Sequence, residues 1–191
     1  METNRLEAFS DGVIAIILTI MVLEMKAPHG NDFSALRPVL PVFLNYALSF
    51  VYVGIYWNNH HHLLKAARRV TAGIMWANLH LLFWLSLFPF VTAWMGANQF
   101  APVPSAFYGG VLLAAAVAYK LLQHLIIADQ GPHSKLASAI GRDLKGVISP
   151  VCYGAAIVAS FFEPWVAGLL YVGVALMWLT PDPRLEPVIK E

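Results

Sequence analysis

Charged residues are scarce in this chain. Aspartate, glutamate, lysine and arginine make up 12% of its 191 residues, whereas 59% are hydrophobic. A soluble globular domain carries about 25% charged residues, and so few charges cannot cover a chain of this length with a polar surface. The shortage excludes an ordinary soluble domain and indicates that much of the surface faces a lipid bilayer.

Cysteine and clustered positive charge are also nearly absent. Cys152 is the only cysteine, which excludes an intrachain disulfide. The formal net charge is +1 and no basic run occurs, so nothing favours a nucleic-acid partner. The apolar stretch after Asp11 is longer than the core of a signal peptide and ends in Glu24-Met25-Lys26. We therefore expect a first membrane helix rather than a cleaved leader.

Long apolar runs are what the chain has instead. A membrane-spanning helix needs about 20 residues, and six segments reach or approach that length. We predict an all-α integral membrane protein, with a single six-helix transmembrane channel domain over residues 1–191. The approximate spans are 7–26, 38–60, 71–96, 104–128, 144–162 and 164–180.

The positive charges predict how this bundle lies in the membrane. If the N-terminus is cytoplasmic, the outside segments hold only Lys26 and Arg37. The inside segments then hold Arg5, Lys65, Arg68, Arg69, Lys135, Arg142, Lys145, Arg184 and Lys190. Because cytoplasmic loops are enriched in lysine and arginine, we expect both termini in the cytoplasm.

Asp11 is the most unusual residue of the first apolar segment. It lies roughly one turn into the predicted span, where an ionisable group costs a few kcal/mol unless it is paired or hydrated. One interpretation makes it a functional residue, with Arg5 and Ser10 as nearby partners. The other makes it an interfacial aspartate that neutralises Arg5 and favours the start of a helix. The residues alone leave both open.

Helical phase separates two faces of this segment. At about 100° per residue, one face carries Gly12, Ile16, Thr19, Ile20 and Leu23, and both Ser10 and Asp11 point away from it. A face of this kind is either the wall of a pore or an ordinary seam between helices. If the face lines a pore, the carboxylate of Asp11 would brace the helix rather than line the pore.

The tract His60-His61-His62 resembles a metal-binding sequence. On a helix consecutive side chains point about 100° apart, so three in a row cannot meet one ion. His80 or His124 would have to complete a zinc or haem site, and no supporting ligand spacing is present. We expect no cofactor, no bound metal and no catalytic residues. We expect interfacial histidines that form hydrogen bonds and respond to pH near neutrality.

A short motif gives the chain a family resemblance. The spacing Arg5-x-x-x-Phe9-Ser10-Asp11 resembles the signature that opens the first helix in the transmembrane protein 175 family of potassium channels. The continuation Gly12-Val13-Ile14-Ala15-Ile16 is similar to prokaryotic members. So are Tyr56-Trp57-Asn58-Asn59-His60-His61 and Leu87-Phe88-Pro89-Phe90-Val91-Thr92. The chain carries one six-helix repeat, as prokaryotic members do.

The resemblance implies a homotetramer in a prokaryotic inner membrane, with the first helix of each subunit around a central pore. It implies potassium as the preferred ion, modestly over sodium and with other monovalent cations conducted more weakly. Ile16 would form the hydrophobic constriction and Thr19 a hydroxyl ring, with Ile20 and Leu23 continuing the apolar wall. The face that the family would use is the one that helical phase selects.

The resemblance also implies a structural gating network that holds the first helix in place. Its members would join the first helix to the second and third. The candidates are Arg5, Phe9, Ser10, Asp11, Trp57, Asn59, His60, His61, Trp76 and Asn78.

Two other function classes compete with a channel. A secondary transporter or proton-permeable carrier would use Asp11 and the membrane histidines as a relay, but the sequence shows no inverted repeat or broken midplane helix. An intramembrane enzyme would need a nucleophile with a base, or paired carboxylates, at one depth. Asp11 has only Glu7, one turn earlier, as a neighbouring carboxylate, so we expect no enzyme.

Overall fold

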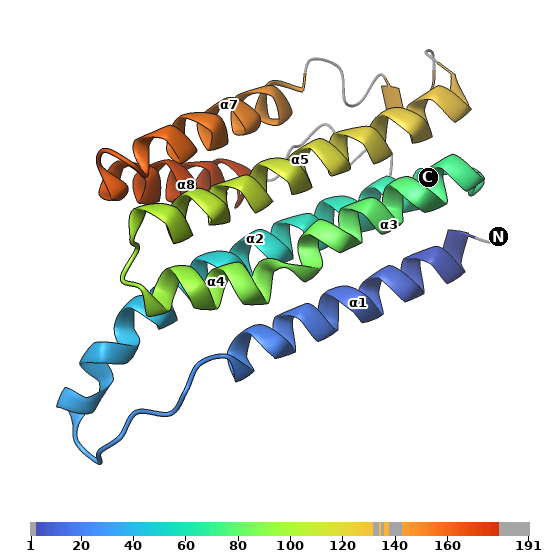
Figure 1. Ribbon diagram of the computed structural model, residues 1–191. Helices are drawn as coiled ribbons and strands as arrows, with labels where there is room; N and C mark the ends of the chain where they lie inside the picture. The colour runs from blue at the N-terminus through green and yellow to red at the C-terminus, as the bar shows by residue number, and fades with distance from the viewer. Residues whose placement is uncertain (1–2, 132–133, 135, 138–142, 180–191) are drawn as a thin grey trace.

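The computed structural model describes residues 3–131, 134, 136–137 and 143–179, and within these ranges it contains helices and no β-strand (Figure 1). The helices whose bounds lie within the described residues follow one another in this order. They are α1 (Thr3–Leu23), a short 3-10 helix (Phe33–Val39), α2 (Leu40–Lys65), α3 (Ala72–Ser86), α4 (Phe88–Ala97), α5 (Pro102–Gln130), α7 (Leu144–Ala159) and α8 (Pro164–Leu179).

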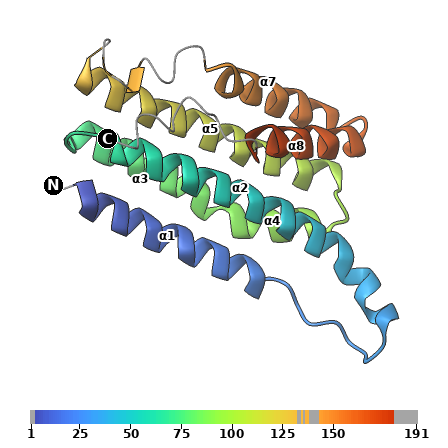
Figure 2. The ribbon, with the colours of Figure 1, turned by 180° about the vertical axis from the view of Figure 1, so that it is seen from behind.

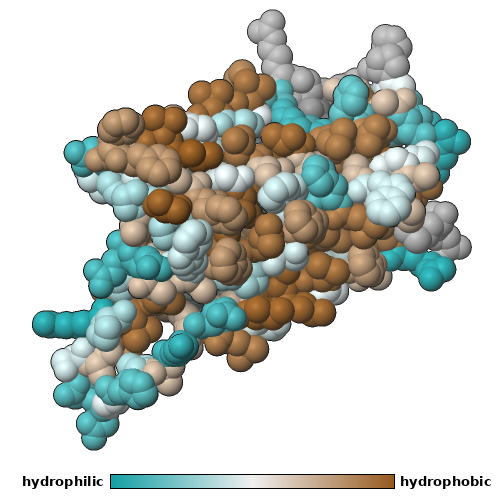
Figure 3. Space-filling model, in the orientation of Figure 1, coloured by the Kyte–Doolittle hydropathy of each residue, from teal (hydrophilic) through white to brown (hydrophobic). Residues whose placement is uncertain are grey.

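The helices have the length and composition of membrane spans. Four apolar helical stretches are long enough to cross a bilayer, and α7 and α8 are shorter apolar helices. Figure 3 shows hydrophobic residues along the body of the bundle and hydrophilic residues gathered towards its two ends. The predicted all-α membrane fold with six helical segments is confirmed, with α3 and α4 together forming the third.

The first two helices extend further towards the N-terminal end of the bundle than the sequence predicted. α1 begins at Thr3, before residue 7, and ends at Leu23. Asp11 therefore lies about two turns into the helix rather than one. α2 continues past residue 60 to Lys65, so His61 and His62 are helical. Residue 180 of the predicted last span lies outside the described residues.

The single helix predicted over residues 71–96 is interrupted. α3 ends at Ser86, α4 begins at Phe88, and Leu87 caps the first helix. The cause is Pro89, which has no amide hydrogen to donate to the carbonyl four residues earlier and whose ring crowds that carbonyl. The two helices together still form one apolar stretch over Ala72–Ala97.

α1 lies at one side of the bundle and α7 at the other, with α5 and α8 next to α7 (Figures 1 and 2). Its buried side chains recur with helical spacing. They are Leu6, Ser10, Ile14, Ile17 and Met21, and α1 contacts α2, α3 and α4. The opposite side of α1 has no neighbour within the described part of the chain. The fold therefore leaves a continuous helical surface uncovered.

A buried polar chain ties α2, α4 and α5 together. Nδ2 of Asn45 donates to the Thr92 carbonyl at 2.6 Å, and the Thr92 hydroxyl donates to Ser49 Oγ at 2.7 Å. Ser49 and the Tyr108 hydroxyl lie 3.0 Å apart. Polar groups within a bilayer must be satisfied internally, so these bonds fix how the three helices pack.

Candidate functional site

The uncovered face of α1 carries the side chains predicted to line a pore. Ile16 is 58% exposed and Leu23 is 78% exposed, and Ile20 and Thr19 are also exposed. The Thr19 hydroxyl donates its hydrogen to the Ile16 carbonyl at 2.8 Å. Because a hydroxyl has one hydrogen and two lone pairs, Thr19 Oγ1 remains an acceptor. This face is therefore an apolar surface with one oxygen, Thr19 Oγ1, whose lone pairs can face a cation.

A buried chain of hydrogen bonds runs from α2 through α3 to α1. Nε2 of His60 lies 2.6 Å from Asn78 Oδ1, Nδ2 of Asn78 donates to Ser10 Oγ at 2.9 Å, and Ser10 donates to the Leu6 carbonyl at 2.8 Å. An amide oxygen only accepts, so His60 must donate from Nε2. His60, Asn78 and Ser10 are fully buried, which makes this chain the interior anchor of α1.

Two further contacts join α1 to α2 beside this chain. Nε1 of Trp57 donates to Asp11 Oδ1 at 3.0 Å. Nδ1 of His61 lies 2.6 Å from Glu7 Oε1. Each helix supplies two residues four apart, which places both on one face of that helix. Two polar contacts, one helical turn apart, therefore join the antiparallel helices α1 and α2.

Four of the predicted network residues do not join these contacts. Arg5 and Phe9 are exposed and share the face of Ile16. Arg5 has no ion pair with Asp11 among the described residues. Trp76 is 67% exposed. Nδ2 of Asn59 donates to the Ile55 carbonyl on its own helix, so its side chain takes no part in the contacts to α1.

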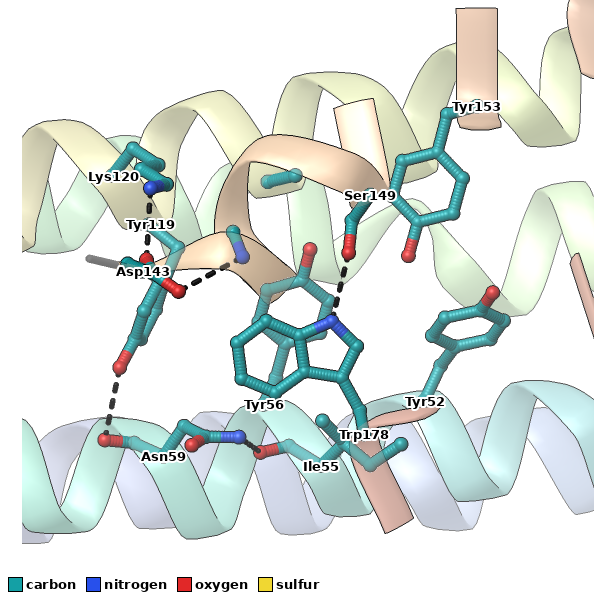
Figure 4. Close-up of a pocket in the computed structure, with 12 residues that line it drawn as sticks. Tyr52, Ile55, Tyr56, Asn59, Tyr119, Lys120, Asp143, Ser149, Tyr153 and Trp178 are labelled. Carbon is teal, nitrogen blue, oxygen red and sulfur yellow. Dashed lines mark hydrogen bonds and ion pairs between the residues drawn. The ribbon is translucent and has the colours of Figure 1, made fainter. Parts of the chain in front are cut away.

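Asn59 belongs to a separate cavity between α2, α5, α7 and α8 (Figure 4). Its carbonyl accepts a hydrogen bond from the Tyr119 hydroxyl at 3.3 Å. In the same cavity Lys120 pairs with Asp143 at 2.8 Å, and Trp178 donates to Ser149. These contacts lie away from α1, and they show that α2 carries two different polar faces.

Glu7 is the residue that sequence reasoning missed. It was considered only as a second carboxylate near Asp11, yet it contacts His61 directly. The four-residue spacing of Glu7 and Asp11, matched by that of Trp57 and His61, is the signal that could have found it.

Substitution of Asp11 tests whether it braces α1. Alanine removes the acceptor for Trp57 and should destabilise the protein by about 1–2 kcal/mol, whereas asparagine keeps Oδ1 and should cost less than about 1 kcal/mol. Thermal unfolding of the purified protein measures both. Equal losses in the alanine and asparagine variants, or no loss in either, would contradict a brace that depends on the Trp57 contact.

A helical bundle with apolar spans and one helix uncovered along its length defines a class, the multi-pass membrane proteins that include channels and transporters. Comparison with known proteins narrows this class. A family model described as the endosomal/lysosomal potassium channel TMEM175 matches residues 5–89. The chain is 53% identical to a potassium channel of Chryseobacterium sp. (strain P1-3) over 191 residues, which is 100% of both chains.

Two further comparisons agree. A potassium channel of Chamaesiphon minutus is 31% identical over 186 residues, which cover 90% of this chain and 91% of that one. The crystal structure of a lysosomal potassium-selective channel TMEM175 homolog from the same organism superposes with a TM-score of 0.80 at 27% identity, over 95% of this chain and 98% of that one. The chain belongs to the TMEM175 family, a family of channels and not of enzymes.

Proposed function

We propose that this protein is a potassium-selective cation channel in which four copies of α1 surround a central pore. The observation that carries the proposal is the uncovered face of α1, which combines Ile16, Ile20 and Leu23 with the hydroxyl of Thr19. Family membership supports the same arrangement. The protein would need no cofactor and no resident metal to conduct, only the bilayer and further copies of itself.

Ile16 is the proposed hydrophobic constriction. Four isoleucine side chains around an axis exclude water when they approach closely, so the pore would close by dewetting. Ile20 and Leu23 would continue the apolar wall beyond it. Dilation of the ring would admit a partly hydrated ion.

Thr19 is the proposed source of selectivity. Its hydroxyl hydrogen is committed to the Ile16 carbonyl, so four such oxygens would face a passing cation with their lone pairs. Potassium gives up its hydration shell more readily than sodium, and a single ring of hydroxyls replaces only part of that shell. The expected preference for potassium over sodium is therefore modest.

A substitution at Thr19 tests this assignment. Thr19→Val keeps the shape but removes the oxygen, and should lower the potassium to sodium permeability ratio by about twofold or more, which corresponds to roughly 0.4 kcal/mol. Thr19→Ser keeps the oxygen and should retain the ratio. Reversal potentials with potassium on one side and sodium on the other measure it. An unchanged ratio in Thr19→Val would remove Thr19 from the selectivity mechanism.

The buried chain His60–Asn78–Ser10 and the Trp57–Asp11 contact are the proposed brace of the pore helix. They hold the inner side of α1 against α2 and α3, while its outer side stays free to line the pore. Arg5, Phe9 and Trp76 are exposed and would complete the network proposed from the family motif through contacts with neighbouring subunits. Asn59 would contribute from the cavity between α2, α5, α7 and α8.

The proposed setting is a prokaryotic inner membrane with cytoplasmic termini. Arg5 at the start of α1, Lys65 at the end of α2, and Arg68 and Arg69 just before α3 lie at one end of the bundle. The positive-inside rule assigns that end to the cytoplasm. The C-terminal residues after 179 lie outside the described residues, so their side is proposed from the even number of spans.

Recording from purified protein in a planar bilayer with opposed potassium and sodium gradients tests the function. A unitary current that reverses near the potassium equilibrium potential would support it. Transport without unitary currents would instead favour a secondary transporter. A current that follows the proton gradient would favour a proton-permeable carrier. Native mass spectrometry should show a mass four times that of the 21.0 kDa chain.

A further inference from the structure

We propose that Glu7, Asp11 and His61 form a binding site for a divalent transition-metal ion of the zinc class. Each residue offers one ligand atom, and these atoms all lie within 4.8 Å of one another. Glu7 and Asp11 come from α1 and His61 comes from α2, in the half of the bundle that holds the N-terminus. The site lies between α1 and α2, away from the proposed pore face of α1.

The ligand set suits this class of ion. Zinc is bound tetrahedrally by imidazole nitrogens and carboxylate oxygens, and its open sites keep three protein ligands with a water at the fourth position. Bond lengths of about 2.0–2.1 Å separate the ligand atoms of such a shell by roughly 3.3 Å. Glu7 Oε1 and His61 Nδ1, now 2.6 Å apart, would separate slightly. Rotation of three half-buried side chains is enough for that change.

Trp57 contacts two of the three ligands, Asp11 and His61, and holds their side chains in place. Its Nε1 donates to Asp11 Oδ1 at 3.0 Å, which leaves the second carboxylate oxygen of Asp11 for an ion. Its ring stacks on the imidazole of His61, with centroids 6.1 Å apart and planes inclined by 28°. Groups that orient metal ligands without touching the metal are typical of built metal sites.

His61 and Glu7 lie close together, but they do not form a well-aligned hydrogen bond that would explain why these two side chains converge. Nδ1 of His61 is shielded from solvent and has no partner with hydrogen-bond geometry among the described residues, although Glu7 Oε1 is 2.6 Å away. The two groups therefore converge without alignment along an N–H direction. Asp11, one turn further along α1, completes a set of three ligand atoms that lie within 4.8 Å of one another.

A metal ion here would link the pore helix to α2. Since an ion that binds the folded protein stabilises the conformation that binds it, occupancy would hold α1 in its present position against α2. The inference goes beyond the proposed function, because metal binding and stabilisation can be measured whether or not the protein conducts potassium.

Calorimetric titration of the full-length purified protein with zinc chloride tests the proposal. Wild-type protein should bind zinc saturably, one ion per chain, and its unfolding temperature should rise with zinc and fall back with a chelator. Glu7→Gln and His61→Gln should each weaken binding at least about tenfold, because even residues that only orient ligands change affinity by that factor.

His62→Gln is the matched control, since His62 is the next residue on α2 and points about 100° away from His61. Its zinc affinity should stay within about twofold of wild type, on the scale where tenfold is 1.4 kcal/mol. No saturable binding to wild type, or equal losses in the His61 and His62 variants, would overturn the site. Should the ligand variants fail to fold, zinc X-ray absorption on wild-type protein decides: a shell with one nitrogen and oxygens supports the site, and an all-oxygen shell overturns it.

Discussion

Replacement of Ile16 by asparagine should make the channel leak. A ring of isoleucines sheds water because its side chains offer no hydrogen bonds, whereas a ring of asparagines would stay hydrated at the same diameter. We expect resting potassium flux into reconstituted vesicles to rise at least about tenfold, which corresponds to a barrier lowered by about 1.4 kcal/mol. Ile16 is 58% exposed, so the change removes little packing within the subunit and folding should be preserved.

Val22→Asn separates a gate from a general effect of polar substitution in α1. Val22 is 43% exposed, close to the 40% of Ile20, but lies about 120° around the helix from Ile16. It should therefore leave resting flux unchanged. Equal leakage in the two variants would show that polar side chains anywhere on α1 loosen the bundle. Unchanged flux in Ile16→Asn would place the constriction elsewhere on the face.

The division of α1 into two faces could be predicted from the sequence because it depends only on helical phase. Once Thr3–Leu23 is a helix, Ile16, Ile20 and Leu23 must share a side and Ser10 must lie away from it. The structure has this arrangement, with Ser10 buried and the three apolar residues exposed. Whether the exposed side meets lipid or further copies of α1 depends on assembly, which periodicity does not encode.

The partners of α1 could be predicted only in part. Asn78 and Trp76 were both assigned to the network, but residues two apart on a helix point about 200° apart, so only one of them can face α1. The same argument separates Asn59 from His61, which contacts α1. Helical phase could have shown that Trp76 and Asn59 do not face α1 within the subunit. It could not have matched Asn78 with Ser10, because the pairing joins residues 68 positions apart and depends on how three helices pack.

The interruption of the third span shows a different limit of prediction from hydropathy. The apolar run over Ala72–Ala97 is continuous by hydropathy, and membrane helices tolerate proline when neighbours satisfy the freed backbone groups. Pro89 was visible in the sequence, yet hydropathy alone does not decide between a kink and a break. In the structure the helix ends at Ser86 and starts again at Phe88.

Asn78→Leu should be the most destabilising single change in the polar network. Leucine has nearly the same shape, but it removes the acceptor of His60 Nε2 and the donor to Ser10 Oγ. Both groups are fully buried, and each unsatisfied group costs about 1–3 kcal/mol. We expect a loss of roughly 2–4 kcal/mol in the free energy of unfolding, seen as a lower unfolding temperature and a smaller fraction of assembled protein.

Asn58→Leu is the matched control, because Asn58 is exposed on α2 and its substitution should change stability by less than about 0.5 kcal/mol. A double-mutant cycle sharpens the result. If Ser10 and Asn78 act through one hydrogen bond, the loss in Ser10→Ala combined with Asn78→Leu should be smaller than the sum of the single losses. Additive losses would mean that the two residues stabilise the protein independently. Similar stability for Asn78→Leu and Asn58→Leu would show that the buried apolar side chains of α1 alone hold it against α2, α3 and α4.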